Sequence, residues 1–266
     1  MSMITLSWWD VAIAALLVLS LAGLSVWQRL ALQRQILIAG LRTVVQLVLV
    51  GLILEIIFAD ARLLWVVLMA MVMLAVAAYE TMARQHRRLK GVWAYGLGAV
   101  SLFSSSFTVA LFALLVIIGN QPWYQPQYAI PLLGMMLGNT MNGIALSLDR
   151  LMSSAWQQRA VIEQRLMLGE DWKQAIGALR VEAMRAGMIP TINGMAAVGV
   201  VSLPGMMTGQ ILSGTAPMEA VKYQIMIMFM VAAGAGFGTV VALQLGARRL
   251  FDERQRLRLE RLTSAD

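Results

Sequence analysis

The sequence contains no cysteine and only one histidine, His86. The absence of cysteine excludes disulfides, thiolate metal sites and thiol catalysis. Because the one histidine lies in a basic segment between apolar runs, a histidine-based catalytic dyad or a His-ligated metal site within the membrane is also excluded. The sequence has no Gly-x-x-x-x-Gly-Lys-Ser/Thr loop, so the chain cannot hydrolyse ATP on its own. We therefore expect neither an enzyme nor a cofactor.

Charge is scarce as well, since 13% of the residues are charged and 59% are hydrophobic. The mean hydropathy is +0.73, as expected for a chain whose outer surface faces lipid as well as water. Apolar runs recur at about the 20 residues that a helix needs to cross a bilayer. They cover residues 8–27, 36–58, 63–79, 92–118, 128–148, 188–212 and 223–246. The sequence thus predicts an all-α, polytopic membrane protein with about seven transmembrane helices.

The 21 Lys and Arg residues are distributed unevenly among the gaps between these runs. All but Arg42, Arg62 and Lys222 lie in alternate gaps or in the C-terminal tail. The positive-inside rule then predicts an N-terminus outside the cell (inner) membrane and a C-terminus in the cytoplasm. The first run is long and lacks a basic leader and a cleavage site, so we expect a retained signal anchor.

The formal net charge of +7 raises the question of nucleic-acid binding. No nucleic-acid-binding motif accompanies the basic residues, which are spread over every gap predicted to be cytoplasmic. Anionic membrane lipids are the expected partners of this charge.

Two polar segments are predicted to lie in the cytoplasm. Residues 149–187 read as an amphipathic surface helix, a turn at Gly169, and a second helix whose N-terminus is favoured by Glu170 and Asp171. The basic tail, residues 247–266, is predicted to form another short surface helix. The whole chain, residues 1–266, is expected to be a single transmembrane domain.

Polar residues inside the apolar runs are candidates for a substrate path, because burying them in lipid costs free energy. Arg42 and Gln46 lie one helical turn apart in the second run and can project together into a helix bundle. Alternatively, Arg42 reaches back to the lipid headgroups.

The fifth run carries a polar stripe, since Met135, Asn139 and Asn142 follow the spacing i, i+4, i+7. The two amides either bond across helices as packing residues or line a path for the substrate. Gly134 and Gly138 in the same run predict a close helix approach.

The sixth run contains Asn193 and then Pro204-Gly205, where a kink or a broken helix is expected because proline removes a backbone hydrogen bond. Interrupted membrane helices commonly expose carbonyl groups to a cavity. Met206 and Met207 follow directly and, with Met135, are the methionines placed beside polar groups.

Most of the 20 methionines are interpreted as apolar filler, as at Met226, Met228 and Met230, so methionine content is a weak signal for a soft metal. Whether they bind metal stays unknown from the sequence. The hydroxyl-rich run from Ser101 to Thr108 is interpreted as structural, because such hydroxyls usually bond to the preceding helical turn.

Several segments together resemble the FetB/YbbM family. They are Arg42-Thr-Val-Val-Gln46, Gly138-Asn139-Thr-Met141, Ile189-Pro190-Thr191, Val200-Val-Ser202-Leu-Pro204-Gly205-Met206-Met207-Thr-Gly209 and Lys222-Tyr223-Gln224-Ile225. The resemblance covers nearly the whole chain, and it implies the membrane permease subunit of an ABC transporter with a separate ATPase and a role in iron export. Some members have Asp and Lys where this chain has Asn193 and Ala197, so a site built on those charges is not carried over.

A long helix–turn–helix between membrane spans is what a separate ATPase would contact. Glu163 and Gly169 match the Glu-(x)5-Gly start of the coupling loop of ABC importers, although the later part of that motif does not follow. We predict that Glu163, Leu168, Gly169, Glu170 and Asp171 couple to the ATPase. The predicted assembly is a homodimer with two ATPase subunits, which exports a metal cation such as iron or a small solute. The alternative is an ion-gradient-driven carrier or a non-transporting membrane scaffold.

Overall fold

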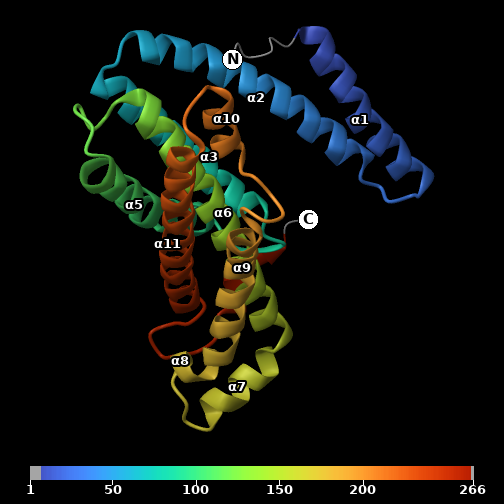
Figure 1. Cartoon of the computed structure of the whole chain (residues 1–266). Coiled ribbons are helices and arrows are strands. Elements are labelled where there is room, and N and C mark those ends of the chain that lie inside the picture. The colour runs from blue at the N-terminus through green and yellow to red at the C-terminus, as the bar shows by residue number, and fades with distance from the viewer. Residues whose placement is uncertain (1–6, 265–266) are drawn as a thin grey trace. The chain divides into compact units, whose positions relative to one another are not determined.

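The computed structural model describes residues 7–264 and is dominated by helices (Figure 1). Residues 1–6 and 265–266, the ends of the predicted single domain, lie outside the described residues. The elements are α1 (Trp8–Trp27), α2 (Gln33–Ala59), α3 (Leu63–Ala83), β1 (Arg87–Leu89), α4 (Val92–Leu102), η1 (Phe103–Phe107), α5 (Thr108–Phe112), η2 (Ala113–Ile118), α6 (Pro126–Gln157), α7 (Arg159–Met167), α8 (Trp172–Ala175), α9 (Gly177–Ala197), α10 (Gly205–Leu212), α11 (Pro217–Arg249), η3 (Leu259–Arg261) and β2 (Leu262–Ser264).

Six helical segments within the described residues are long and apolar enough to cross a membrane. They are α1, α2, α3, the continuous stretch Val92–Ile118 that includes two π-helical turns, α6 and α11. This confirms the predicted all-α, polytopic membrane fold. The sixth predicted run, residues 188–212, is not a seventh continuous span, because its helix is interrupted between Ala197 and Gly205.

The chain forms two compact units. The first contains the residues up to Arg62 together with Leu212–Gly214, and its main feature is the hairpin of α1 and α2. The two helices approach where a Cβ atom on Gly40 would lie 3.4 Å from Cγ1 of Val18. Of the residues of α2, only Ile57 is buried. Such a long apolar helix needs lipid or another protein around it.

The second unit contains Leu63–Ile211 and Thr215–Asp266. Its centre is formed by α6 and α11, which pack against each other and against α9, while α3 and α4 pack on other faces of this pair. Large side chains that are fully buried here include Leu102, Met136, Ile144 and Leu148. Because lipid is as apolar as these side chains, close van der Waals packing between the helices, and not their removal from water, is what stabilises the membrane-spanning part of the unit.

Glycines allow the closest approach of helices in this unit. A Cβ atom on Gly187 of α9 would lie only 2.6 Å from the carbonyl oxygen of Gly143 on α6. The predicted close approach at Gly134 and Gly138 is therefore only partly right. A Cβ atom on Gly134 would meet Met73 of α3 at 3.1 Å, whereas one on Gly138 would meet no atom within 4 Å. The tightest crossing lies further along α6 than the sequence indicated.

The prediction that hydroxyls of the hydroxyl-rich run bond to the preceding helical turn is confirmed for Ser104, Ser105 and Thr108. The hydroxyl oxygens of Ser101 and Ser106 are buried without a hydrogen-bond partner among the described residues. Ser105 donates to the carbonyl oxygen of Ser101 at 2.7 Å, and Thr108 donates to that of Ser104 at 2.6 Å. These bonds satisfy hydroxyls within their own helix. A Cβ atom on Gly238 of α11 would lie 2.7 Å from Oγ of Ser105, so this stretch also packs tightly against α11.

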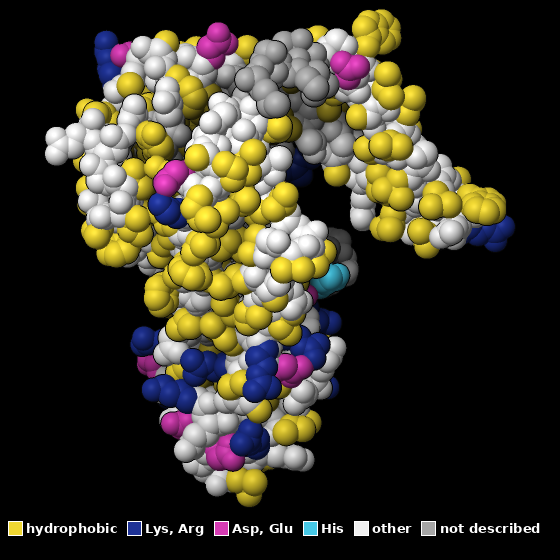
Figure 2. Space-filling view, viewed as in Figure 1, with side chains coloured by type: hydrophobic (Ala, Val, Ile, Leu, Met, Phe, Trp, Pro, Cys, Tyr) yellow, Lys and Arg dark blue, Asp and Glu magenta, His cyan; other side chains and the backbone are white. Residues whose placement is uncertain are grey.

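Beyond the apolar part, α6 continues without interruption to Gln157. Leu151 and Ala155 are fully buried in this extension. The predicted surface helix from residue 149 was therefore wrong in its first part, because these apolar residues pack within the unit. We call the region formed by the end of α6, α7, α8, β1 and the tail from Arg248 the basic end of the second unit. Figure 2 shows Lys, Arg, Asp and Glu gathered there, below a predominantly apolar surface.

The predicted helix–turn–helix is present at the basic end as α7, a turn, α8 and α9. Gly169 has a φ of +93°, a left-handed conformation that favours glycine. Asp171 caps α8 by accepting a hydrogen bond from the backbone N–H of Gln174 at 2.8 Å. The expected role of Gly169 in the turn and of an acid at the start of the second helix is thus confirmed.

The tail does not form the predicted surface helix. After α11 it turns back, with a β-bridge between Phe251 and Leu257, and then forms η3 and β2. Strand β2 pairs antiparallel with β1, so that Leu262 lies opposite Leu89. The prediction was wrong because the leucine spacing of the tail cannot reveal a pairing partner far away in the sequence.

Candidate functional site

A cavity of about 240 Å³ lies at the interruption between α9 and α10. Four segments of the second unit contribute to it: α6, α9, the start of α10 and α11. The residues that line it are Met135, Asn139, Pro190, Thr191, Gly194, Pro204, Gly205, Met206, Gln224, Ile227, Met228 and Val231. The interruption thus supplies one wall, and three long helices supply the others.

The helix breaks earlier than the proline alone requires. The C-cap of α9 is Val198, whose N–H donates to the carbonyl oxygen of Gly194 at 3.2 Å. Gly199 then adopts a φ of +83° and donates to the carbonyl oxygen of Ser202 at 2.9 Å. The new helix begins when Thr208 donates to the carbonyl oxygen of Pro204 at 3.0 Å. The predicted broken helix is confirmed, and a left-handed glycine reinforces the effect of the proline.

Five of the predicted path residues meet at this cavity. Met135 and Asn139 come from α6, Pro204 precedes α10, and Gly205 and Met206 begin it. The amide nitrogen of Asn139 donates to the carbonyl oxygen of Met135 at 2.8 Å, which holds the amide against its own helix. The stripe on α6 therefore lies beside the broken helix.

Four lining residues on α11 were not predicted as part of the path: Gln224, Ile227, Met228 and Val231. Gln224 is only 7% exposed, and its Oε1 atom has no hydrogen-bond partner among the described residues. An unpartnered buried acceptor is costly, which makes Gln224 the most informative polar group of the cavity. In the sequence, the indication was a lone amide in an apolar run, two residues after Lys222.

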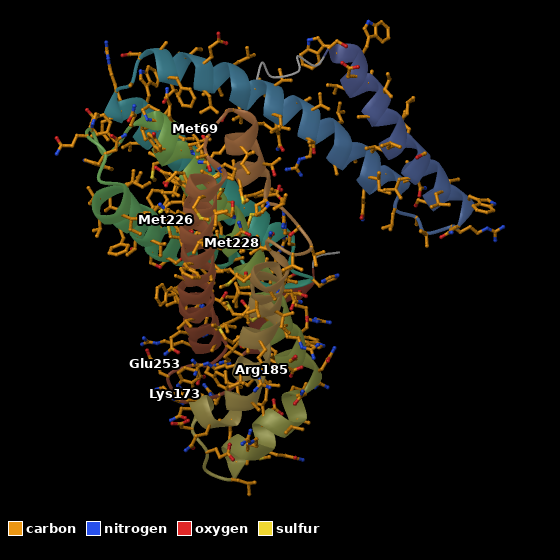
Figure 3. All side chains as sticks on the ribbon, viewed as in Figure 1. Met69, Lys173, Arg185, Met226, Met228 and Glu253 are labelled. Carbon is orange, nitrogen blue, oxygen red and sulfur yellow. The ribbon has the colours of Figure 1, made fainter. Side chains whose placement is uncertain are left out.

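Met228, interpreted from the sequence as apolar filler, also lines the cavity. Figure 3 shows Met226 and Met228 on α11, well separated from Lys173 on α8 and Arg185 on α9. With Met135 and Met206, Met228 gives the cavity three thioether groups. Thioethers are soft, neutral donors that favour soft metal ions over hard ones.

The remaining predicted path residues lie elsewhere. Asn142 is exposed and accepts a hydrogen bond from the guanidinium group of Arg84 through its amide oxygen. Asn193 is also exposed, and neither it nor Met207 lines the cavity. Arg42 and Gln46 lie on α2 in the first unit, and both are exposed.

The cavity is uncharged and mainly apolar: three of its twelve lining residues, Asn139, Thr191 and Gln224, have polar side chains, and none is ionisable. Among the described residues there is also no group of three or more His, Asp or Glu that could hold a metal ion. The available donors are the amide groups of Asn139 and Gln224, the hydroxyl of Thr191 and the thioethers. Neutral donors of this kind hold a solute or ion weakly enough to release it again.

A second candidate feature is the turn between α7 and α8. Met167 and Leu168 are 79% and 84% exposed at its tip, an unusual position for two large apolar side chains. Glu170 forms an ion pair with Arg165 at 2.9 Å. Of the predicted coupling residues, Glu163 and Leu168 are exposed, whereas Glu170 and the capping Asp171 stabilise the turn.

Comparison with known proteins identifies relatives over most of the chain. Residues 8–251 match the family described as "Uncharacterised protein family (UPF0014)". The chain is 40% identical to "UPF0014 membrane protein slr1647" of Synechocystis, over 96% of this chain and 98% of that protein. It is 32% identical to "Probable iron export permease protein FetB" of Escherichia coli, over 93% of both chains. It is 31% identical to "Protein ALUMINUM SENSITIVE 3" of Arabidopsis thaliana, over 87% of this chain and 83% of that protein.

No solved structure matches the chain. The family match and these identities agree with the six apolar helices and with the segments that suggested the resemblance. The chain belongs to the UPF0014 family of multi-pass membrane proteins.

Proposed function

We propose that this protein is the membrane permease subunit of an ATP-driven exporter in the cell (inner) membrane, that a separate ATPase energises it, and that it moves a metal cation such as iron. The observation that carries the proposal is the cavity at the interruption between α9 and α10. A broken membrane helix that borders a cavity is a recurrent feature of solute pathways, and this cavity offers three polar side chains, Asn139, Thr191 and Gln224. The relative from Escherichia coli, whose printed name is that of a probable iron export permease, supports the choice of cargo.

The composition of the cavity suits transient binding of a cation. A cation that leaves water must be given new ligands, because hydrocarbon offers none. The unpartnered oxygen of Gln224, the amide of Asn139 and the methionine sulfurs are the ligands available. Since none of them carries a charge, the cation would be bound only weakly and could leave on the far side.

The exposed tip at Met167 and Leu168 supports coupling to a separate ATPase. Both side chains project from a turn that is fixed by the Arg165–Glu170 ion pair and by the left-handed Gly169. Apolar side chains on a rigid turn can enter a groove on a soluble partner, and their exposure in the isolated chain is otherwise unfavourable.

A homodimer is part of the proposal. The segment between α9 and α10 exposes Val200, Val201 and Leu203, the first two by 89% and 83%. A second copy packed on this segment would cover these side chains and would bring two interrupted helices together. Oligomers of identical chains usually form such two-fold contacts.

The test is reconstitution of the chain with a candidate ATPase subunit of the ABC type. We expect ATPase activity that depends on this chain and ATP-driven accumulation of Fe²⁺ in inside-out proteoliposomes. Leu168→Glu should uncouple hydrolysis from transport, because a charge at the tip cannot enter an apolar groove. Val181→Glu is the matched control, since Val181 is exposed on α9 outside the turn.

Normal transport by Leu168→Glu would show that the turn between α7 and α8 does not couple the chain to the ATPase. Transport that is driven by an ion gradient without any ATPase would instead favour the alternative, a secondary carrier. Absence of transport under both conditions, with a folded protein, would favour a non-transporting scaffold.

A further inference from the structure

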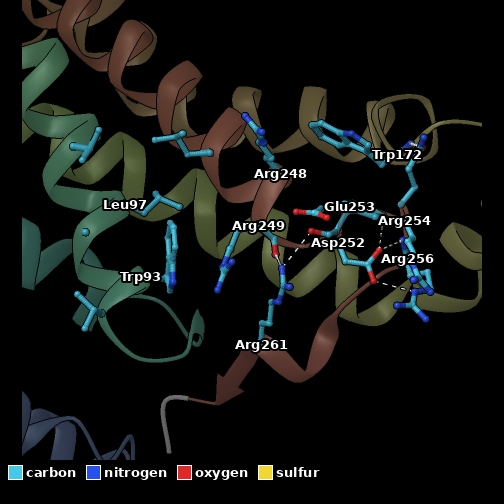
Figure 4. Close-up of a pocket in the computed structure, with 16 residues that line it drawn as sticks. Trp93, Leu97, Trp172, Arg248, Arg249, Asp252, Glu253, Arg254, Arg256 and Arg261 are labelled. Atoms are coloured by element: carbon cyan, nitrogen blue, oxygen red, sulfur yellow. Dashed lines mark hydrogen bonds and ion pairs between the residues drawn. The ribbon is translucent and has the colours of Figure 1, made fainter.

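We propose that a groove at the basic end of the second unit binds one anionic phospholipid. The groove has a volume of about 1470 Å³ and lies between the start of α4, the end of α11 and the tail (Figure 4). It is separate from the cavity at the broken helix, with which it shares no residue. Its lining combines an apolar wall, which suits an acyl chain, with a cluster of arginines, which suits the phosphate of a lipid headgroup.

The apolar wall belongs to membrane-spanning helices. Leu97 and Val100 lie one turn apart on α4, and Leu245 lies on α11 one turn before its basic end. Val100 and Leu245 are exposed in the chain. Because both helices continue from here into their apolar spans, an acyl chain can follow this wall into the bilayer.

The basic part contains more positive charge than the groove itself neutralises. Five arginines, at positions 248, 249, 254, 256 and 261, face two acids, Asp252 and Glu253, which leaves a net charge of +3. Arg256 is paired with Asp252 at 2.9 Å. Arg261 donates to the carbonyl oxygen of Arg249 at 2.8 Å.

Three arginines remain for a ligand. Within residues 7–264, the guanidinium groups of Arg248, Arg249 and Arg254 form no ion pair with a carboxylate. Arg249 stacks on Trp93, with its guanidinium carbon 4.2 Å from the ring centroid. Stacking on a ring face leaves the N–H groups at the guanidinium edge free to donate to a phosphate. Figure 4 shows Trp93 and Arg249 side by side.

The position of the cluster favours a lipid over a soluble anion. Arg248 and Arg249 are in the last turn of α11, where an apolar span ends, and tryptophan is enriched at this level of a bilayer. Basic groups just beyond a span attract anionic headgroups. A free phosphate or an acidic peptide would use the arginines but would leave Val100 and Leu245 exposed, whereas a phospholipid covers both parts.

Native mass spectrometry of the purified chain tests this. After exchange into phosphatidylglycerol and phosphatidylcholine with identical acyl chains, we expect one retained phosphatidylglycerol and a preference of about tenfold for it. Arg248→Gln/Arg249→Gln should abolish the preference. Arg254→Gln, whose side chain is exposed in the tail, should weaken it by about threefold without affecting folding.

Lys90→Gln is the matched control, because Lys90 is exposed nearby but does not line the groove. Equal retention of the two lipids by the unaltered chain would overturn the proposal. The proposal would also be overturned if Lys90→Gln lost as much of the preference as Arg248→Gln/Arg249→Gln, because that result would indicate general attraction of the lipid to the basic surface. Displacement of phosphatidylglycerol by millimolar inorganic phosphate would identify a free-anion site, and displacement by a glutamate-rich peptide would identify a protein-docking site.

Discussion

Gly187 on α9 and Gly143 on α6 form the closest backbone approach among the described glycines, with a Cβ atom on Gly187 placed 2.6 Å from the Gly143 carbonyl oxygen. The neighbouring atom is backbone, so it cannot move aside as the end of a flexible side chain can. The crossing of α6 and α9 therefore depends on the absence of two side chains, and α6 and α9 both line the cavity.

Gly187→Ala should destabilise the protein by about 1–3 kcal/mol, because the added methyl group forces the two helices apart. Thermal unfolding in detergent measures this effect. Gly177→Ala on the same helix is the control, since a Cβ atom there would meet no atom within 4 Å. If both variants unfold at the temperature of the unaltered protein, the close approach does not exist in the folded chain.

Gln224→Leu should reduce transport per molecule while leaving stability unchanged or higher, because it removes a buried acceptor that lacks a partner. Thr239→Val is the matched control on α11, since its hydroxyl is also buried without a partner but lies outside the cavity. Fe²⁺ transport and thermal stability are measured on the same proteoliposomes. Loss of transport in both variants would mean that Gln224 has no special role in the path.

The tail should be sensitive to acid through Asp252. Hydrogen bonding from the backbone N–H of Arg256, supported by the positive charges of Arg256 and Arg258, lowers the pKa of Asp252 from 3.8 to about 2. A carboxyl with a lowered pKa in the folded state adds stability above its unfolded pKa, and this is lost as pH falls toward the folded pKa. We expect the tail to keep its order above pH 3.8 and to lose it toward pH 2.

Hydrogen exchange at the Arg256 amide reports this change. Asp252→Asn should show a lower protection factor, the ratio of intrinsic to observed exchange rate, already at neutral pH and no further decrease of this ratio on acidification. Glu253→Gln is the control, because Glu253 is exposed. A tail of Asp252→Asn that stays as protected as the unaltered chain would rule out this anchoring role.

The predicted orientation can be tested by thiol labelling, because the chain has no cysteine of its own. Thr215→Cys should react with an impermeant reagent from outside, and Lys90→Cys should not. Both positions are exposed, whereas Gln85 is buried and would stay unlabelled on either side of the membrane. External labelling of Lys90→Cys would reverse the orientation assigned from the basic residues.

The elements that could be predicted from the sequence are those governed by local composition. The five apolar runs before residue 149 are long enough to identify helices from hydropathy alone, and Pro204 predicts the broken helix because proline has no N–H to donate. Gly169 likewise predicts the turn after α7, because its left-handed backbone is a local property.

The remainder depends on contacts between distant residues. Gln224 and Met228 belong to the cavity only because α11 packs beside α6 and α9, and nothing in their own run indicates which face they occupy. Asn142 was grouped with Asn139 by helical spacing, but Arg84 binds its amide outside the cavity. The pairing of Leu262 with Leu89 is a similar case, since strand partners are chosen by tertiary packing.

The unbroken course of α6 has a mechanical consequence. One helix carries Met135 and Asn139 at the cavity and ends at Gln157, directly before α7. From Asn139 to Gln157 the helical rise amounts to about 27 Å, so a tilt of about 5° at one end displaces the other by about 2 Å. The helix can thus act as a lever, which converts a small push near the exposed turn into a change in the width of the cavity.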